Sequence, residues 1–142
     1  MSQRESRTTF RVRFGETDSA GIVFYPNFFV YFDLATHELF RGSPIGLADQ
    51  MRGGGFGIPI VECGARFVAA LFHDDEITIV TRVAEVRTRA LRVEHEVFRA
   101  GALCASGFEA RVYGRKKPDG SGLELAPIPA DLAAWLRNED PA

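Results

Sequence analysis

Residues 27–41 read NFFVYFDLATHELFR. Apolar side chains would cover nearly the whole circumference of a helix formed by this stretch, and Pro26 before it suits the first position of a helix. A helix that is apolar almost all round is a buried helix, so other elements of this small chain must wrap around it. We therefore predict a central buried helix that begins near Pro26.

Alternating apolar and polar residues predict strands on both sides of this helix. One strand is predicted over residues 8–14, and after a glycine-rich connection at 42–57 four more follow at hairpin spacing, over about 61–71, 76–86, 89–99 and 103–115. Asp74–Asp75 and Ala100–Gly101 are predicted turns, and a bulge near residues 83–86 would explain a break in the alternation. A short amphipathic helix is expected near residues 130–137. This order favours an α+β fold in which one antiparallel sheet curls around one helix.

The same alternation assigns side chains to the two faces of each strand. The apolar face of the first strand is predicted to carry Phe10, Val12 and Phe14. In the last strand, Phe108, Ala110 and Val112 are predicted on the face opposite Glu109 and Arg111. His95 falls on the apolar side of its strand, where we expect a core histidine with satisfied hydrogen bonds.

Composition limits the classes of function. The chain has 142 residues, of which 46% are hydrophobic, which fits one domain over residues 1–142. A net charge of -2 gives no basic field for nucleic acid. The polar N-terminus and the lack of a run of about 18 apolar residues argue against a signal peptide and a membrane span, so we expect a cytoplasmic protein.

The cysteines and histidines do not predict a disulfide framework or a metal site. Cys63 and Cys104 are too few for such a framework and lack partners at metal-ligand spacing, so we interpret them as small buried hydrophobic residues. The three histidines are scattered. The glycines of residues 53–57, GGGFG, lack the lysine and hydroxyl residue of a phosphate-binding loop and indicate a plain connection.

The segment Gly15–Phe40, GETDSAGIVFYPNFFVYFDLATHELF, resembles the signature of the 4-hydroxybenzoyl-CoA thioesterase family, most specifically over Asp18–Asn27. The resemblance extends more loosely over the strands from Ile58 to Arg115. It implies a hotdog fold, in which a five-stranded antiparallel sheet wraps a long central helix. It also implies a homodimer, commonly assembled into a homotetramer, with active sites between subunits.

The family resemblance implies hydrolysis of an acyl-CoA thioester, with Asp18 at the position of the catalytic carboxylate. This chemistry needs a carboxylate that attacks the carbonyl carbon or activates a water, and donors for the negative charge that develops on oxygen. The backbone N–H of Tyr25, where the loop enters the helix, is the donor we expect. Nucleophile and general base both stay open for Asp18, and a turn or capping role is its structural alternative. Glu16 replaces an aspartate of many relatives, which bears on the hydrogen bonds that orient the loop.

Further residues are expected to contact the substrate. Gly21 would let the backbone approach the thioester, although it also suits a simple turn. Asp33 interrupts the apolar helix and lies one turn before His37, so it forms either a structural pair or a contact with a polar group of the substrate. The substrate-binding residues that complete the prediction are Ile22, Phe24, Asn27 and Ile60.

Two basic clusters are candidates for the phosphates of coenzyme A. The favoured cluster is Arg87, Arg89 and Arg92, and the other is Arg115, Lys116 and Lys117. Many aromatic residues favour an aromatic acyl group such as benzoyl or hydroxybenzoyl, ahead of short or medium aliphatic chains. We expect no metal or redox cofactor, since coenzyme A is part of the substrate. The alternative class is a non-catalytic acyl-CoA-binding protein, and a hotdog hydratase would need an acid and histidine arrangement that the sequence lacks.

Overall fold

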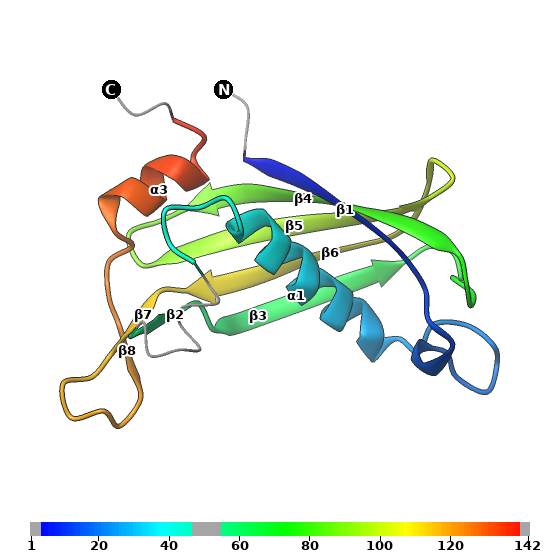
Figure 1. The fold of residues 1–142 in the computed structure, drawn as a ribbon, viewed down its shortest axis with the longest axis horizontal. Coiled ribbons are helices and arrows are strands. Elements are labelled where there is room, and N and C mark those ends of the chain that lie inside the picture. Colours follow the sequence, from blue (N-terminus) through cyan, green and yellow to red (C-terminus); the bar gives the residue numbers. More distant parts are fainter. Residues whose placement is uncertain (1–3, 47–54, 140–142) are drawn as a thin grey trace.

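The computed structural model describes residues 4–46 and 55–139, and its main element is a five-stranded antiparallel sheet (Figure 1). The sheet has the order β1-β4-β5-β6-β3. Its strands are β1 (Glu5–Arg11), β3 (Ile60–Phe67), β4 (Glu76–Val86), β5 (Ala90–Arg99) and β6 (Ala102–Val112). The predicted sheet and the predicted bulge are confirmed, the bulge lying between Val83 and Glu85. Part of the predicted glycine-rich connection lies outside the described residues.

Smaller elements surround this sheet. A 3-10 turn, η1 (Phe14–Glu16), precedes helix α1 (Pro26–Phe40). A second sheet contains β2 (Phe56–Gly57), β7 (Gly114–Lys116) and β8 (Leu123–Leu125), and α3 (Ala130–Leu136) is the predicted C-terminal helix. None of the helices among residues 4–46 and 55–139 is long and apolar enough to cross a membrane.

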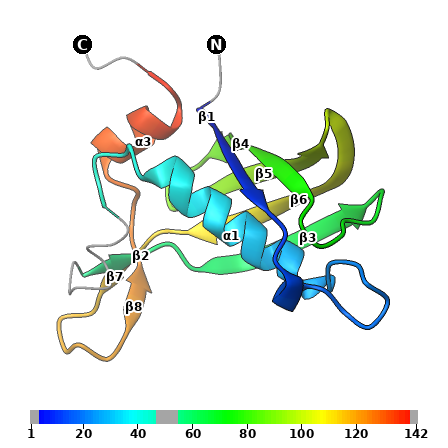
Figure 2. The same ribbon diagram turned by 45° about the vertical axis from the view of Figure 1, so that its right-hand side comes forward.

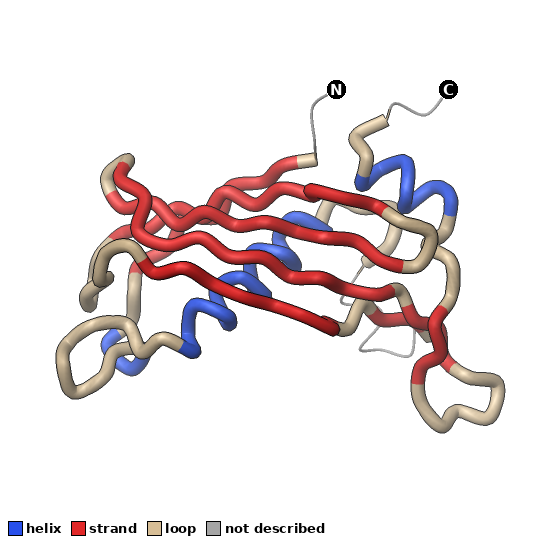
Figure 3. The backbone as a smooth tube through the Cα atoms, turned by 180° about the vertical axis from the view of Figure 1, so that it is seen from behind, coloured by secondary structure: helices blue, strands red, loops and turns tan. Residues whose placement is uncertain are grey.

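Helix α1 lies across one face of the large sheet in Figures 1 and 2, and Figure 3 shows the opposite face of the sheet from behind. The α+β hotdog arrangement expected from the sequence is therefore confirmed. The side of α1 that faces the sheet is buried, whereas Val30 and Leu34 on its other side are 59% and 40% exposed. The prediction of a helix buried all round is thus wrong for a single chain, because the sheet covers one side of α1.

The centre of α1 packs closely onto the sheet. The Phe32 ring stacks on the imidazole of His95, with 4.8 Å between ring centroids and 4° between the planes. Gly107 makes room for this ring, since a Cβ at that position would collide with Phe32 and lie 2.8 Å from the carbonyl oxygen of Gly64. His95 is 1% exposed, which confirms the expected core histidine.

The prediction for the faces of β6 is wrong. Glu109 and Arg111 are 1% and 4% exposed and lie on the helix side of the sheet, because they pair across strands with the inward-facing residues Val93 and Leu91. The register between β5 and β6 shifts by one residue next to Val97. A shift of one residue moves every later side chain to the other face.

Other differences lie at strand ends and edges. Strand β1 ends at Arg11, so Phe14 falls in the 3-10 turn and is 75% exposed instead of facing the core. Strand β3 ends at Phe67, before the predicted residue 71. Cys104 is buried as expected, but the prediction is wrong for Cys63, which lies on the edge strand β3 and is exposed. The predicted last strand is divided into β6 and β7.

Candidate active site

The loop between η1 and α1 is a tight turn closed at its base. Thr17 and Val23 form an antiparallel bridge, and the Asp18 N–H donates to the Ile22 carbonyl at 2.9 Å. The Gly21 N–H donates to the Asp18 carbonyl at 2.9 Å, with a φ of 83° at Gly21 that favours glycine. Gly21 therefore has the turn role, and a Cβ added there would meet no atom within 4 Å, which leaves open space beside it.

The carboxylate of Asp18 is exposed at the surface of this loop. Its Oδ1 accepts a hydrogen bond from the Ala20 N–H at 2.8 Å, which is the turn interaction considered as the alternative role. Its Oδ2 has no hydrogen-bond partner among the described residues. Asp18 thus keeps one oxygen available for chemistry while the other fixes the side chain.

The loop ends at the N-terminus of α1, beside Tyr25. Tyr25 is the residue before Pro26, and no acceptor for its N–H is found in the described part of the chain. Such a donor lies at the partially positive end of the helix dipole, where it favours negative charge. The Tyr25 ring is 61% exposed and meets the exposed Phe24 ring edge to face, with 5.3 Å between centroids.

An apolar cavity of about 310 Å³ opens beside Tyr25. One wall comes from the loop and the start of α1, including the predicted Ile22. The other wall is the last residue of β3 and the segment after it, and Ile22 forms a bridge to Phe72 at the end of this segment. The sequence reasoning missed this second wall, Phe67, Val68, Ala69, Ala70 and Leu71. Its apolar run fits the predicted strand over 61–71, so the periodicity of the sequence gives no signal for a pocket.

Glu16 connects the loop to α1 through both its backbone and its side chain. Its carbonyl accepts from the Phe24 N–H at 2.9 Å and from the Asn27 side-chain amide at 2.8 Å. Its Oε1 accepts from the Arg13 N–H at 2.7 Å and from the Tyr31 hydroxyl at 2.9 Å. The side-chain amide N–H of Asn27, a predicted substrate contact, therefore donates to the loop backbone.

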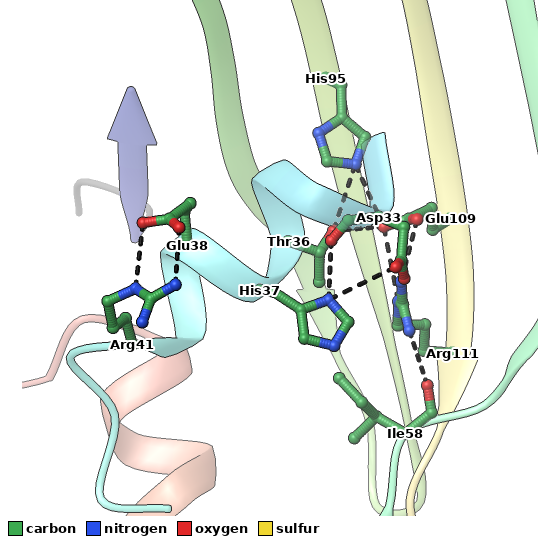
Figure 4. Close-up of polar contacts among 9 residues, drawn as sticks. All are labelled: Asp33, Thr36, His37, Glu38, Arg41, Ile58, His95, Glu109 and Arg111. Atoms are coloured by element: carbon green, nitrogen blue, oxygen red, sulfur yellow. Dashed lines mark hydrogen bonds and ion pairs between the residues drawn. The ribbon is translucent and has the colours of Figure 1, made fainter. Parts of the chain in front are cut away.

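Asp33 lies on α1 and joins a network of charges (Figure 4). Its Oδ1 accepts from Arg111 Nη2 at 2.8 Å, and its Oδ2 lies 3.6 Å from Nδ1 of His37. Arg111 also donates to Glu109 Oε2 at 2.9 Å and to the Ile58 carbonyl at 2.9 Å. The predicted pairing of Asp33 with His37 is present, but the buried arginine is the closer partner. The Asp33 side chain is 49% exposed, so it still faces solvent.

Glu109 is the buried centre of this network, and the sequence reasoning missed it. Its Oε1 accepts from the Thr36 hydroxyl and lies 3.1 Å from Nε2 of His95. Burial raises the pKa of Glu109, but the hydrogen bond to His95, the charge of Arg111 and the hydrogen bond from Thr36 together lower this pKa to about 2. Glu109 is therefore ionised inside the core. The signal that could have identified it is the pair of charges in β6 opposite apolar residues of β5.

The remaining predicted residues are not brought to the Asp18 loop. Ile60 begins β3 and is 41% exposed, and the predicted basic cluster surrounds the β4–β5 hairpin. This hairpin and the loop lie at opposite ends of the molecule in Figure 1. The contrast shows that one chain does not unite all the predicted site residues.

The arginines of the β4–β5 hairpin lie close to acidic residues. Arg87 Nε lies 2.7 Å from Glu85, and Arg92 Nε lies 3.1 Å from Glu94 with its guanidinium 4.0 Å from the centre of the Phe108 ring. Arg87 and Arg92 line a cavity of about 200 Å³ on this part of the sheet, whereas Arg89 is exposed outside it. Within residues 4–46 and 55–139, no cluster of three side chains suited to hold a metal is found.

Comparison with known proteins gives consistent matches over most of the chain. Residues 12–136 match the thioesterase-like superfamily. The chain is 34% identical to 4-hydroxybenzoyl-CoA thioesterase of Pseudomonas sp. (strain CBS-3), over 85% of this chain and 89% of the relative. It is 26% identical to 1,4-dihydroxy-2-naphthoyl-CoA hydrolase of Nostoc punctiforme, over 96% of this chain and 87% of that one.

Solved structures agree with these sequence matches. A gentisyl-coenzyme A thioesterase superposes with a TM-score of 0.80 at 35% identity, covering 89% of this chain and 98% of the other. A mutant 4-hydroxybenzoyl-CoA thioesterase, with asparagine in place of an aspartate and 4-hydroxybenzoyl-CoA bound, gives a TM-score of 0.83 at 33% identity. That match covers 94% of this chain and 99% of the other.

Proposed function

Since the chain belongs to the thioesterase-like superfamily, we propose that it hydrolyses an aromatic acyl-CoA to the free acid and coenzyme A, with Asp18 as the catalytic carboxylate. The observation that carries the proposal is the juxtaposition, in one short loop, of a carboxylate with a free oxygen and a helix N-terminus with an unpaired N–H at Tyr25. The relatives named above are thioesterases and hydrolases of CoA esters.

In the proposed reaction, Asp18 has two possible roles that lead to the same products. As a nucleophile it attacks the thioester carbonyl carbon, the C–S bond breaks, coenzyme A leaves as the thiolate, and water hydrolyses the resulting anhydride. As a general base it removes a proton from the water that attacks the same carbon. In both roles the Tyr25 N–H donates to the oxygen that becomes negative. Neither route needs a metal or a redox cofactor.

The apolar cavity supports an aromatic acyl group. Ile22 and Tyr25 line it, Phe24 lies against Tyr25, and the open space at Gly21 lets the thioester approach the backbone. The relatives named above act on hydroxylated aromatic acyl-CoA esters. We propose that Asp33 accepts a hydrogen bond from a ring hydroxyl, because it is a half-exposed carboxylate on α1. Aliphatic acyl groups remain the alternative substrates.

A second chain would complete the site. The loop and the β4–β5 hairpin lie at opposite ends of one chain, so an Asp18 loop and the phosphate-binding arginines Arg87, Arg89 and Arg92 would come from different subunits. We propose a homodimer that assembles into a homotetramer, and a cytoplasmic location. Ultracentrifugation of the purified chain tests the assembly, and a monomer that is fully active would contradict the shared site.

Release of free thiol from a panel of CoA esters tests the reaction. We expect turnover of hydroxybenzoyl-CoA and benzoyl-CoA above that of short-chain esters. Replacing Asp18 with Asn should lower kcat by about 10²–10⁴-fold, because the carboxylate is lost while the side-chain shape is kept. The matched control is Asp74→Asn, in another exposed turn, which should leave kcat unchanged.

Two results would contradict this proposal. Undiminished thiol release by Asp18→Asn would remove Asp18 from the mechanism. Binding of the esters without any thiol release by the unmodified chain would favour the alternative function, a non-catalytic acyl-CoA-binding protein.

A further inference from the structure

We propose that Glu16 is a positioning residue that sets the place of the Asp18 carboxylate relative to the Tyr25 N–H, and that the Tyr31 hydroxyl holds Glu16 in place. The inference rests on the proposed function, because it assigns roles around the same two reacting groups. It concerns the glutamate that stands where the family resemblance leads us to expect an aspartate.

The backbone of Glu16 joins the two halves of the site. Its carbonyl oxygen accepts hydrogen bonds from the Phe24 N–H and from the Asn27 side chain. Phe24 directly precedes Tyr25, and Asn27 follows it by two residues. Asp18 follows Glu16 by two residues and is tied to the loop through Thr17 and Val23. A displacement of Glu16 would therefore move the carboxylate and the oxyanion donor relative to each other.

The side chain of Glu16 fixes this junction to the core. Its Oε1 receives the Arg13 N–H and the Tyr31 hydroxyl. Tyr31 is 1% exposed, and its ring is held between Phe10 and Phe28 with centroid distances of 5.1 and 5.8 Å. Burial and the hydrogen bond to Glu16 raise the pKa of Tyr31, so its hydroxyl stays a donor. The loop is thereby tied to a buried residue of α1.

The length of the Glu16 side chain matches the position of Tyr31. An aspartate would withdraw the carboxylate by about 1.5 Å, the length of one carbon–carbon bond. The contact to Tyr31, now 2.9 Å, would then exceed the limit for a hydrogen bond. Glu16 and Tyr31 therefore work as a pair, and neither contacts the reacting atoms directly.

The first experiment replaces Tyr31 with Phe, which removes the hydroxyl and keeps the ring. We expect kcat to fall about tenfold with KM changed less than twofold, because small displacements of reacting groups lower the rate strongly. The matched control is Tyr113→Phe, since Tyr113 packs in the other half of the core and its hydroxyl makes no hydrogen bond within the described residues. An unchanged kcat for Tyr31→Phe would overturn the inference.

A second set of variants tests whether kcat depends on the position or on the charge of the Glu16 side chain. Glu16→Gln keeps an oxygen that accepts from both donors and should retain kcat within about threefold, whereas Glu16→Ala and Glu16→Asp should lose at least as much as Tyr31→Phe. Adding Tyr31→Phe to Glu16→Ala should cause no further loss, because both act through one contact. Equal losses for Gln and Ala would show that charge matters instead of position, which contradicts the inference.

Hydrogen exchange supplies a readout that does not depend on turnover. In Tyr31→Phe, amides of residues 16–25 should exchange about tenfold faster than in the unmodified chain, with the amides of β5 unchanged. If Tyr31→Phe speeds exchange in the loop but the unmodified chain releases no thiol, the proposed function is refuted and the positioning role of Glu16 stands. An active chain whose loop exchange and kcat are both insensitive to Tyr31→Phe would refute the positioning role alone.

Discussion

Two hydroxyl groups of helix α1 donate hydrogen bonds to two glutamates, and these two hydrogen bonds lie in different surroundings. At the loop, Tyr31 donates to Glu16, which is half-buried and otherwise receives only a backbone N–H on its carboxylate. At the sheet, Thr36 donates to Glu109, which is 1% exposed and is also bound by His95 and Arg111. The same kind of hydrogen bond thus belongs to a surface loop in one region and to the core in the other.

This difference in surroundings predicts that Glu109 affects the stability of the fold, whereas Glu16 affects the geometry of the Asp18 loop. A carboxylate in the core loses its hydration, so the charge of Glu109 depends on its buried hydrogen-bond and ion-pair partners. Glu16 keeps part of its hydration, so losing one partner costs less energy there. Glu16 instead determines the position of the Asp18 loop relative to α1. We therefore expect substitutions around Glu109 to change the free energy of unfolding and those around Glu16 to change kcat.

The largest expected effect on stability follows from Glu109→Gln. This change removes the buried one of the two carboxylates paired with the guanidinium of Arg111 and leaves only the half-exposed Asp33, so we expect a loss of about 3 kcal/mol in the free energy of unfolding. Urea unfolding followed by circular dichroism measures it. The matched change Glu16→Gln should cost below about 1 kcal/mol. Equal losses at the two glutamates would remove the distinction between the regions.

Acid should weaken the core through the protonation of Glu109. The pKa of Glu109 is about 2 in the folded chain and near 4.5 in its usual range, so the unfolded chain binds more protons between these values. The stability that Glu109 contributes is complete above about pH 5 and is lost as the pH falls toward 2, by roughly 3 kcal/mol. Unfolding measured at several pH values should show this loss, and Glu109→Gln should show a smaller one. The same pH dependence in both chains would contradict the assignment.

The smallest expected effects on stability come from substituting two glycines, one in the core and one in the Asp18 loop. Gly107→Ala would press a methyl group against Phe32 and the Gly64 backbone, so we expect a loss of about 1.5 kcal/mol in thermal or urea unfolding. Gly21→Ala meets no neighbour and should cost about 1 kcal/mol through its positive φ alone. A larger cost at Gly21 than at Gly107 would contradict the description of the core as the tightly packed region.

Much of the fold follows from local pattern. Pro26 and the apolar run after it locate α1, and the spacing of turns at Asp74 and Gly101 gives the order of the later strands. These features depend on neighbours in the sequence, which a periodic pattern records. The turn that contains Asp18 also follows from its own Gly and Asp residues.

Features that depend on distant contacts could not be predicted in this way. The inward position of Glu109 depends on one bulge near Val97, which no composition rule locates. The link between Glu16 and Tyr31 joins residues on two elements whose relative placement comes from packing. The wall of the cavity after Phe67 appears only once β3 is folded beside the loop.

The bulge between β5 and β6 also determines which changes in chain length this protein can tolerate. Inserting one residue into β6 between Cys104 and Gly107 would turn Phe108 toward α1 and move Glu109 and Arg111 to the solvent face, whereas deleting one residue there would only remove the extra residue of the bulge and leave Glu109 opposite Val93. Length changes in the Ala100–Gly101 turn leave the bulge in place and carry no such penalty. Insertion scanning along β6 should thus find a sharp boundary between tolerant and intolerant positions, located at Cys104.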